Sequence, residues 1–143
     1  MTGKANIIII LAAGKGTRMN SQLPKVLHLL KNKPLLSYVI NTSKELSPFK
    51  IIVVVGYKKE LIINQFNDDN VVFVEQKKLM GTADAIKNCL PSLQNFDGDV
   101  LILSGDVPMI KIDTLMNFFS HHNKNKALGS LISTDLEDPA GYG

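Results

Sequence analysis

The sequence has little of several features that would define a protein class at once. Of its 143 residues, 1 is a cysteine and none is a tryptophan. A single cysteine, Cys89, excludes a disulfide framework and a zinc site built on several cysteines. It falls within an expected helix beside Leu90, so we expect it to pack in the core. With 6 Phe and 3 Tyr, the chain also offers few aromatic surfaces on which single-stranded nucleic acid could stack.

Strong charge and long apolar segments are missing as well. The 16 Lys and Arg residues against 13 Asp and Glu residues give a net charge of +3. That is mild for a nucleic-acid binder but suits a small anionic substrate. The longest early apolar run, Ile7 to Ala13, is far too short to span a bilayer, and no signal peptide pattern is present. We therefore expect a cytoplasmic protein that acts on small molecules, with no nucleic acid and no membrane as a partner.

The chain does have enough apolar residues for a core, because 45% of its residues are hydrophobic and 20% are charged. Apolar runs predict buried strands at 7–11, 51–55, 71–74 and 100–103, and a weaker one at 128–132. Continuous β-branched runs are typical of parallel strands that are covered on both faces. Helices are expected between them, at 34–46, 59–66, 82–90 and 113–122. This alternation predicts an α/β fold, a Rossmann-like three-layer sandwich with a mostly parallel sheet.

Ligands of such sheets bind at the carboxyl ends of the strands, so the turns after the strands hold the candidate residues. The first turn is the small-residue segment Leu11-Ala12-Ala13-Gly14-Lys15-Gly16-Thr17-Arg18. Its backbone N–H groups can approach an anion closely, and Lys15, Arg18 and Lys25 add positive charge. The segment fits neither a Walker loop nor a dinucleotide fingerprint. A glycine turn with solvated charges is the alternative, but three cations behind a buried strand favour phosphate binding.

Two later turns carry the other polar candidates. Asp106 follows the strand at 100–103, where a carboxylate can serve as a Mg²⁺ ligand, although a lone Asp can also simply cap a turn. Gln76 follows the strand at 71–74 and carries both an amide donor and an acceptor, which suits the edge of a nucleobase. Gly81 and Thr82 open a helix whose first N–H groups are available to a ligand, and Thr82 is also expected to cap that helix.

These residues together resemble a known family. The motifs are Leu11-Ala12-Ala13-Gly14-x-Gly16-Thr17-Arg18-Met19, Pro24-Lys25-Val26-Leu27-His28, Gln76 with Gly81-Thr82-Ala83, Gly105-Asp106-Val107-Pro108 and Gly141-Tyr142-Gly143. In this order they resemble the sugar-phosphate nucleotidylyltransferases, and within them the N-terminal uridylyltransferase domains of bacterial bifunctional uridylyltransferase/acetyltransferases. The resemblance implies a nucleotide-diphospho-sugar transferase fold. It also implies a reaction in which UTP and N-acetylglucosamine 1-phosphate form UDP-N-acetylglucosamine and pyrophosphate, with Mg²⁺ as cofactor.

The resemblance also implies roles for individual residues. Arg18 and Lys25 would be catalytic, with Arg18 stabilising the departing pyrophosphate and Lys25 holding the α-phosphate. Asp106 would bind Mg²⁺, and Gly141 would contact the sugar. The nucleotide would be bound by Leu11, Ala12, Ala13, Gly14, Lys25, Gln76, Gly81 and Thr82. One departure is Leu79, which stands where the family often has a second glutamine near the uracil.

We expect residues 1–143 to be the N-terminal part of a single nucleotidylyltransferase domain. The family domain continues further, with a second metal ligand and most of the sugar contacts, and the β-helix acetyltransferase domain follows it. Full-length members are trimers, but the sequence does not fix the oligomeric state of this chain. The alternatives are a non-catalytic nucleotide-binding fragment and a related nucleotidylyltransferase with another base or sugar. A dinucleotide dehydrogenase needs an acidic residue about 20 residues after the glycines, and residues 34–41 have none.

Overall fold

The computed structural model describes residues 6–66 and 70–138. The chain divides into two compact units, Met1–Ile112 and Asp113–Gly143. Every candidate residue except Gly141 falls in the first unit.

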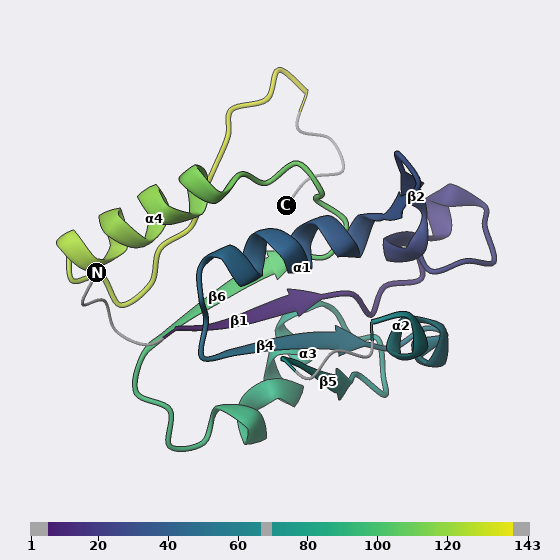
Figure 1. The fold of residues 1–143 in the computed structure, drawn as a ribbon, viewed down its shortest axis with the longest axis horizontal. Coiled ribbons are helices and arrows are strands. Elements are labelled where there is room, and N and C mark those ends of the chain that lie inside the picture. The colour runs from purple at the N-terminus through teal and green to yellow at the C-terminus, as the bar shows by residue number, and fades with distance from the viewer. Residues whose placement is uncertain (1–5, 67–69, 139–143) are drawn as a thin grey trace. The chain divides into compact units, whose positions relative to one another are not determined.

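The first unit is built on a four-stranded parallel sheet (Figure 1). In the order β5-β4-β1-β6, its strands are Val71–Glu75, Lys50–Val55, Asn6–Leu11 and Asp99–Ser104. All three pairings are parallel, which confirms the four strands predicted from continuous apolar runs. Leu11 is in register with Val54 on one side and Ser104 on the other. The turns that follow β1, β4 and β6 therefore begin at the same edge of the sheet.

Helices connect these strands. They are α1 (Leu35–Glu45), α2 (Lys59–Gln65) and α3 (Thr82–Cys89), which match the predicted helices within about two residues. Pro34 is the N-cap of α1, where its fixed φ suits the start of a helix. Short 3-10 turns lie at Thr17–Met19 (η1), Lys25–Leu27 (η2) and Leu90–Leu93 (η3), and a small hairpin joins Leu29–Leu30 (β2) to Lys33–Pro34 (β3).

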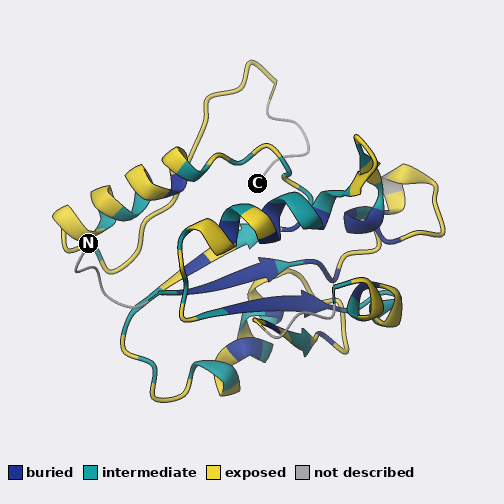
Figure 2. Cartoon of the chain, in the orientation of Figure 1, coloured by how far each residue is buried: buried dark blue, intermediate teal, exposed yellow. Residues whose placement is uncertain are grey.

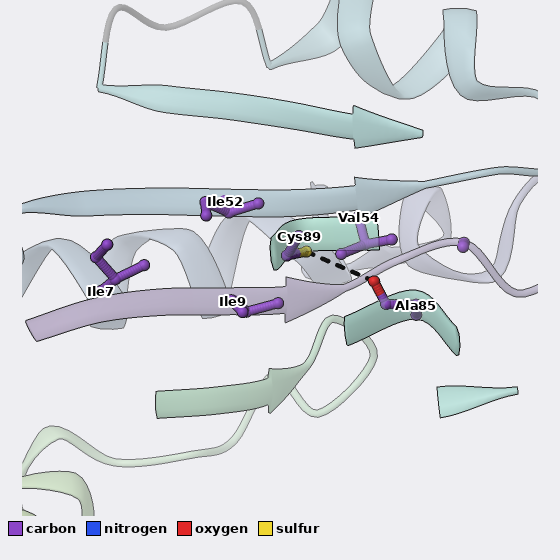
Figure 3. Close-up of a cluster of buried hydrophobic side chains, with 7 residues drawn as sticks. Ile7, Ile9, Ile52, Val54, Ala85 and Cys89 are labelled. Atoms are coloured by element: carbon purple, nitrogen blue, oxygen red, sulfur yellow. Dashed lines mark hydrogen bonds between the residues drawn. The ribbon is translucent and has the colours of Figure 1, made fainter. Parts of the chain in front are cut away.

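The two central strands are buried on both faces, as Figure 2 shows. In β1, Ile7 and Ile9 pack with Ala85 and Cys89 of α3, in the cluster drawn in Figure 3. Because successive side chains of a strand point to opposite faces, Ile8 and Ile10 face the other side, which α1 covers (Figure 1). The result is the expected three-layer α/β sandwich, with Cys89 in its core.

The second unit contains helix α4 (Ile112–Lys124) apart from its first residue, and an irregular segment after it. His122 and Ser130 approach each other there, with 2.9 Å between Nδ1 and Oγ. The strand predicted at 128–132 was wrong, since those residues form no strand. A strand exists only through hydrogen bonds to a neighbouring strand, and Gly129 and Ser130 weaken the local preference for extended structure. Across the described residues, no helix is long and apolar enough to cross a membrane.

Candidate functional site

The glycine-rich loop after β1 is hydrogen-bonded to the sheet at its first residue, and the next N–H groups along the loop have no backbone acceptor in the described part of the chain. Ala12 N–H donates to the Val54 carbonyl at 2.8 Å. The N–H groups of Gly14, Lys15 and Gly16 donate to no backbone carbonyl among the described residues. Successive unpaired N–H groups in a turn form a concave site for anions. The loop therefore leaves three successive N–H groups without a backbone acceptor among the described residues.

Gly16 is a glycine for two physical reasons. Its φ of 63° is left-handed, and a Cβ built there would lie 2.7 Å from Cβ of Lys25. Gly14 differs, because a Cβ there would meet nothing within 4 Å. Gly16 thus lets the loop pass directly over the segment that carries Lys25, while Gly14 borders open space that a ligand can use.

Lys25 reaches across to the turn after β6. Its Nζ lies 2.6 Å from Oδ2 of Asp106, and the two side chains are 42% and 29% exposed. The position of Asp106 is set by its neighbour Gly105, whose N–H donates to the Leu11 carbonyl at 2.9 Å. A Cβ on Gly105 would lie 3.0 Å from that same oxygen, so a larger residue would force the two segments slightly apart. The two loops therefore meet through opposite charges.

A cavity of about 320 Å³ lies between these loops. It brings together five of the residues predicted for the site, namely Leu11, Ala12, Gly14, Lys25 and Asp106. It also includes residues that the sequence did not single out for binding, namely Gly16, Thr17, Met19 and Val26. Ala13 is not part of this lining, because its side chain packs into the core cluster.

Gln76 is 5% exposed at the carboxyl end of β5. Its backbone N–H donates to the Val55 carbonyl at 2.8 Å, and its Nε2 donates to the Gly81 carbonyl at 3.0 Å. The side chain thus joins β5 to the start of α3.

Gly81, not Thr82, is the N-cap of α3, and no side chain caps the helix there. The expectation that Thr82 caps this helix was wrong, because Gly81, with φ of 98°, takes a backbone conformation that threonine rarely adopts.

The turn after β4 lies beside the glycine-rich loop, although no residue of this turn was predicted for the site. Tyr57 N–H donates to the Ala13 carbonyl at 3.2 Å. Two ammonium groups lie over the Tyr57 ring, Lys15 Nζ at 5.9 Å and Lys58 Nζ at 5.5 Å from its centroid. Such cation–π contacts hold both charges near the loop. The rule that pointed to the other turns would also have found this one, since Tyr57 follows a buried strand.

Leu79, the departure from the family pattern, packs over this turn. A Cβ on Gly56 would lie 2.8 Å from Cδ2 of Leu79 and 3.1 Å from Cβ of Ala13. Gly56 therefore leaves the space that Leu79 occupies. An apolar contact replaces the polar one that the family pattern places at this position.

Two further residues, Arg18 and Gly141, were predicted for the site. The backbone of Arg18 forms part of η1, whose first residue follows Gly16. Gly141 lies outside the described residues. The roles of both residues stay predictions.

The donors present suit a divalent cation that also binds a substrate. No group of three or more His, Cys, Asp or Glu side chains comes together among the described residues. Asp106 is the acidic residue that lines the cavity. Mg²⁺ typically takes one or two protein carboxylates and completes its shell with phosphate oxygens and water. Asp106 therefore fits a metal that arrives with a polyphosphate, and does not form a metal site by itself.

The fold and the site together define a class: an α/β protein with a glycine-rich loop and an opposing carboxylate at one edge of a parallel sheet. Solved structures of this fold include a nucleotidyl transferase from Methanothermobacter thermautotroptrophicus, 20% identical, with a TM-score of 0.68 over 83% of this chain and 58% of that one. Another is 4-diphosphocytidyl-2C-methyl-D-erythritol synthase from Anaerococcus prevotii, 22% identical, with a TM-score of 0.68 over 85% of this chain and 52% of that one. At these identities the likeness shows the fold.

The sequence relatives define the family. The profile of the MobA-like NTP transferase domain matches residues 8–138, and the chain belongs to this family. The bifunctional protein GlmU of Nostoc sp. strain PCC 7120 is 42% identical over 137 residues, which are 96% of this chain and 30% of that protein. GlmU of Synechococcus sp. strain JA-3-3Ab is 43% identical over 95% of this chain and 22% of that protein. The chain thus spans at most about 30% of these relatives' length, and the resemblance stated from its motifs is confirmed.

Proposed function

We propose that the chain binds UTP and transfers its uridylyl group to N-acetylglucosamine 1-phosphate, forming UDP-N-acetylglucosamine and pyrophosphate. The observation that carries this proposal is the Lys25–Asp106 pair, held at 2.6 Å across the phosphate loop. Nucleotidyl transfer needs little covalent chemistry from the protein, because positioning and neutralisation of charge do most of the work. A cation and a metal-ligand carboxylate beside an anion-binding loop supply both.

The ion pair is easily opened by substrate. Both partners are partly exposed, and such pairs contribute roughly 0–1 kcal/mol. A triphosphate can therefore take Lys25 while Asp106 turns to a divalent cation. Mg²⁺, when bound, would neutralise phosphate charge during the transfer. Structural support for a divalent metal comes from Rv0371C of Mycobacterium tuberculosis, which shares the fold at a TM-score of 0.68 and was solved as a complex with manganese.

The remaining residues position the substrates in this proposal. The N–H groups of the loop from Gly14 to Gly16 hold the phosphates, and Lys25 holds the α-phosphate as the sugar phosphate attacks. Arg18 stabilises the pyrophosphate that leaves, and Gly141 contacts the sugar. Gln76 and the start of α3 at Gly81 and Thr82 read the base. The support for the base site is that β5 and α3 place these three residues together.

Thermal melting with Mg²⁺ and each of UTP, CTP, GTP and ATP tests the nucleotide site without requiring turnover. A ligand at 100 times its Kd stabilises the fold by about 2.7 kcal/mol, which raises Tm by roughly 4 °C or more for a chain of this size. We expect that shift with UTP. Equal shifts with all four would keep the phosphate site and reject the uracil assignment. No shift with any would reject the proposal.

A second candidate function is nucleotide binding without turnover. It is favoured by the lining of the described cavity, which has a single carboxylate. Release of pyrophosphate separates the two functions. With N-acetylglucosamine 1-phosphate added, ordinary enzymes turn over at about 1–10³ s⁻¹. A melting shift with UTP but no pyrophosphate release would support the binding-only function for this chain.

A further inference from the structure

The Gln76 side chain is fixed in one orientation by two acceptors on the same atom. Its Nε2 lies 3.0 Å from the Gly81 carbonyl and 2.8 Å from Oδ2 of Asp84. Only an NH₂ group can satisfy two acceptors, because a carbonyl oxygen placed there would face two other oxygens. Both N–H bonds of the amide are therefore used inside the protein. The orientation follows from the chemistry of the neighbours.

The other end of the amide is left as a pure acceptor. No described residue donates to Gln76 Oε1, and this atom is not among the buried polar atoms without a partner. It thus remains reachable from solvent although the residue as a whole is 5% exposed. An acceptor of this kind selects a donor. Uracil presents an N–H at N3, whereas cytosine presents an acceptor at N3.

Asp84 is itself held in place. It lies half-buried in the first turn of α3, where a carboxylate is favoured by the helix dipole. Asn88, one turn later, donates from Nδ2 to the Asp84 backbone carbonyl at 2.7 Å and to Oδ2 at 3.4 Å. The Gly81 carbonyl also accepts from Ala85 N–H at 3.1 Å, as the first bond of the helix. The two acceptors that fix Gln76 are thus parts of one ordered helix start.

We propose that Asp84 is a specificity-determining positioning residue, which holds the Gln76 amide so that Oε1 accepts from a base N–H and rejects cytosine. The proposal rests on the proposed function, because it assumes that Gln76 meets the base. Without the Asp84 carboxylate, one amide hydrogen loses its partner and the group can rotate by 180°. Nε2 would then face the base and donate to N3 of cytosine as readily as Oε1 accepts from uracil.

The test compares the Kd values of the chain for UTP and CTP, with Mg²⁺ present. We expect the unaltered chain to prefer UTP about tenfold or more, because the wrong base leaves acceptor facing acceptor. Asp84→Ala should bring the ratio to about threefold or less. Asp84→Asn keeps a carbonyl acceptor and should restore most of the preference. A merely structural role for Asp84 would weaken both nucleotides alike and leave their ratio unchanged.

Glu60→Ala is the matched control, since Glu60 is the acidic residue in the first turn of α2. This variant removes the same charge from a helix start that does not touch Gln76, and it should leave the ratio of the Kd values for UTP and CTP unchanged. A second readout needs no nucleotide: NMR of the Gln76 side-chain NH₂ should show faster hydrogen exchange in Asp84→Ala. An unchanged ratio or unchanged exchange overturns the role of Asp84. Failure of the unaltered chain to bind any nucleotide overturns the proposed function instead.

Discussion

Two cavities lie at opposite ends of the same parallel sheet, and they differ in chemistry more than in size. The cavity at the carboxyl edge is about 320 Å³, and the one near the amino ends of β4 and β5 is about 420 Å³. The second is lined by Lys44, Ser47, Pro48, Phe49, Lys50, Ile51, Asn70 and Val72. It has lysines but no carboxylate and no glycine. Volume therefore does not single out the candidate site, whereas its opposed charges and close backbone approach distinguish it from the second cavity.

The largest expected effect comes from removing Lys25 at the carboxyl edge of the sheet, with Lys50 at the opposite end as the control. Lys25→Ala should lower the rate of nucleotidyl transfer by roughly 10²–10³-fold, because one group that stabilises developing charge is lost. Lys50→Ala removes the same charge from the second cavity and should leave the rate unchanged. Steady-state pyrophosphate release measures both. Equal losses in the two variants would show that net charge, not position, governs the activity.

Lys25→Ala also separates the two partners of the ion pair. Asp106 loses the ammonium group that lies 2.6 Å away, so a divalent cation no longer competes with it. A single carboxylate binds a divalent cation only weakly without phosphate oxygens, and we expect this weak Mn²⁺ affinity to be higher in the variant than in the unaltered chain when no nucleotide is present. Titration followed by electron paramagnetic resonance of free Mn²⁺ measures this. Unchanged Mn²⁺ affinity would argue against Asp106 as the metal ligand.

The next comparison concerns backbone conformation at three positions. Gly16→Ala should destabilise the fold by about 1–2 kcal/mol or more, since its φ of 63° disfavours a Cβ and that Cβ would also clash with Lys25. Gly14→Ala, at an open position of the same loop, should leave stability nearly unchanged. In the second cavity Ser47 has φ of 49° just after α1, so Ser47→Gly should stabilise by about 0.5–1 kcal/mol. Urea denaturation tests all three.

Part of the fold and of the candidate site could be predicted from the sequence. The strands were predictable because residues such as Ile8 and Val53 form continuous β-branched runs. The position of the glycine-rich loop was predictable because its glycines follow such a strand, and its role in phosphate binding stays a prediction. By contrast, the direct pairing of Lys25 with Asp106 depends on tertiary contacts between loops about 80 residues apart. The orientation of the Gln76 amide likewise depends on a helix start that packs beside β5, and the sequence pattern alone does not reveal such a contact.

The aromatic pair beside the second cavity tests whether that end is structural. Phe49 is 71% exposed but stacks on Phe96, with 6.0 Å between ring centroids. Such pairs contribute about 0.5–1.5 kcal/mol, so Phe49→Ala should lower the free energy of unfolding by about 1 kcal/mol. Nucleotide binding at the other end should not change, as isothermal titration with UTP would show. A loss of UTP affinity without a loss of stability would mean that the two ends communicate.

The smallest expected effect comes from the core that lies between the two cavities. Burial raises the pKa of the Cys89 thiol to about 11, from an ordinary value of 9.0. Below pH 9 the thiol is protonated in both the folded and the unfolded chain, so it adds no pH dependence. Between pH 9 and 11 the unfolded chain loses this proton first, and the folded state loses stability as the pH rises.

Cys89→Ala removes that pH dependence while adding a constant cost for the lost sulfur contacts. The difference in unfolding free energy between the unaltered chain and the variant should therefore shrink by somewhat less than about 1 kcal/mol between pH 7.5 and 9.5. Urea denaturation at both values measures it. A constant difference would contradict the raised pKa.

Because Cys89 packs with Ile9 and Val54 (Figure 3) and lines neither cavity, the UTP affinity of the folded variant should match that of the unaltered chain at pH 7.5. The chemistry of the carboxyl edge would then depend on its own loops, with the sheet as a fixed support.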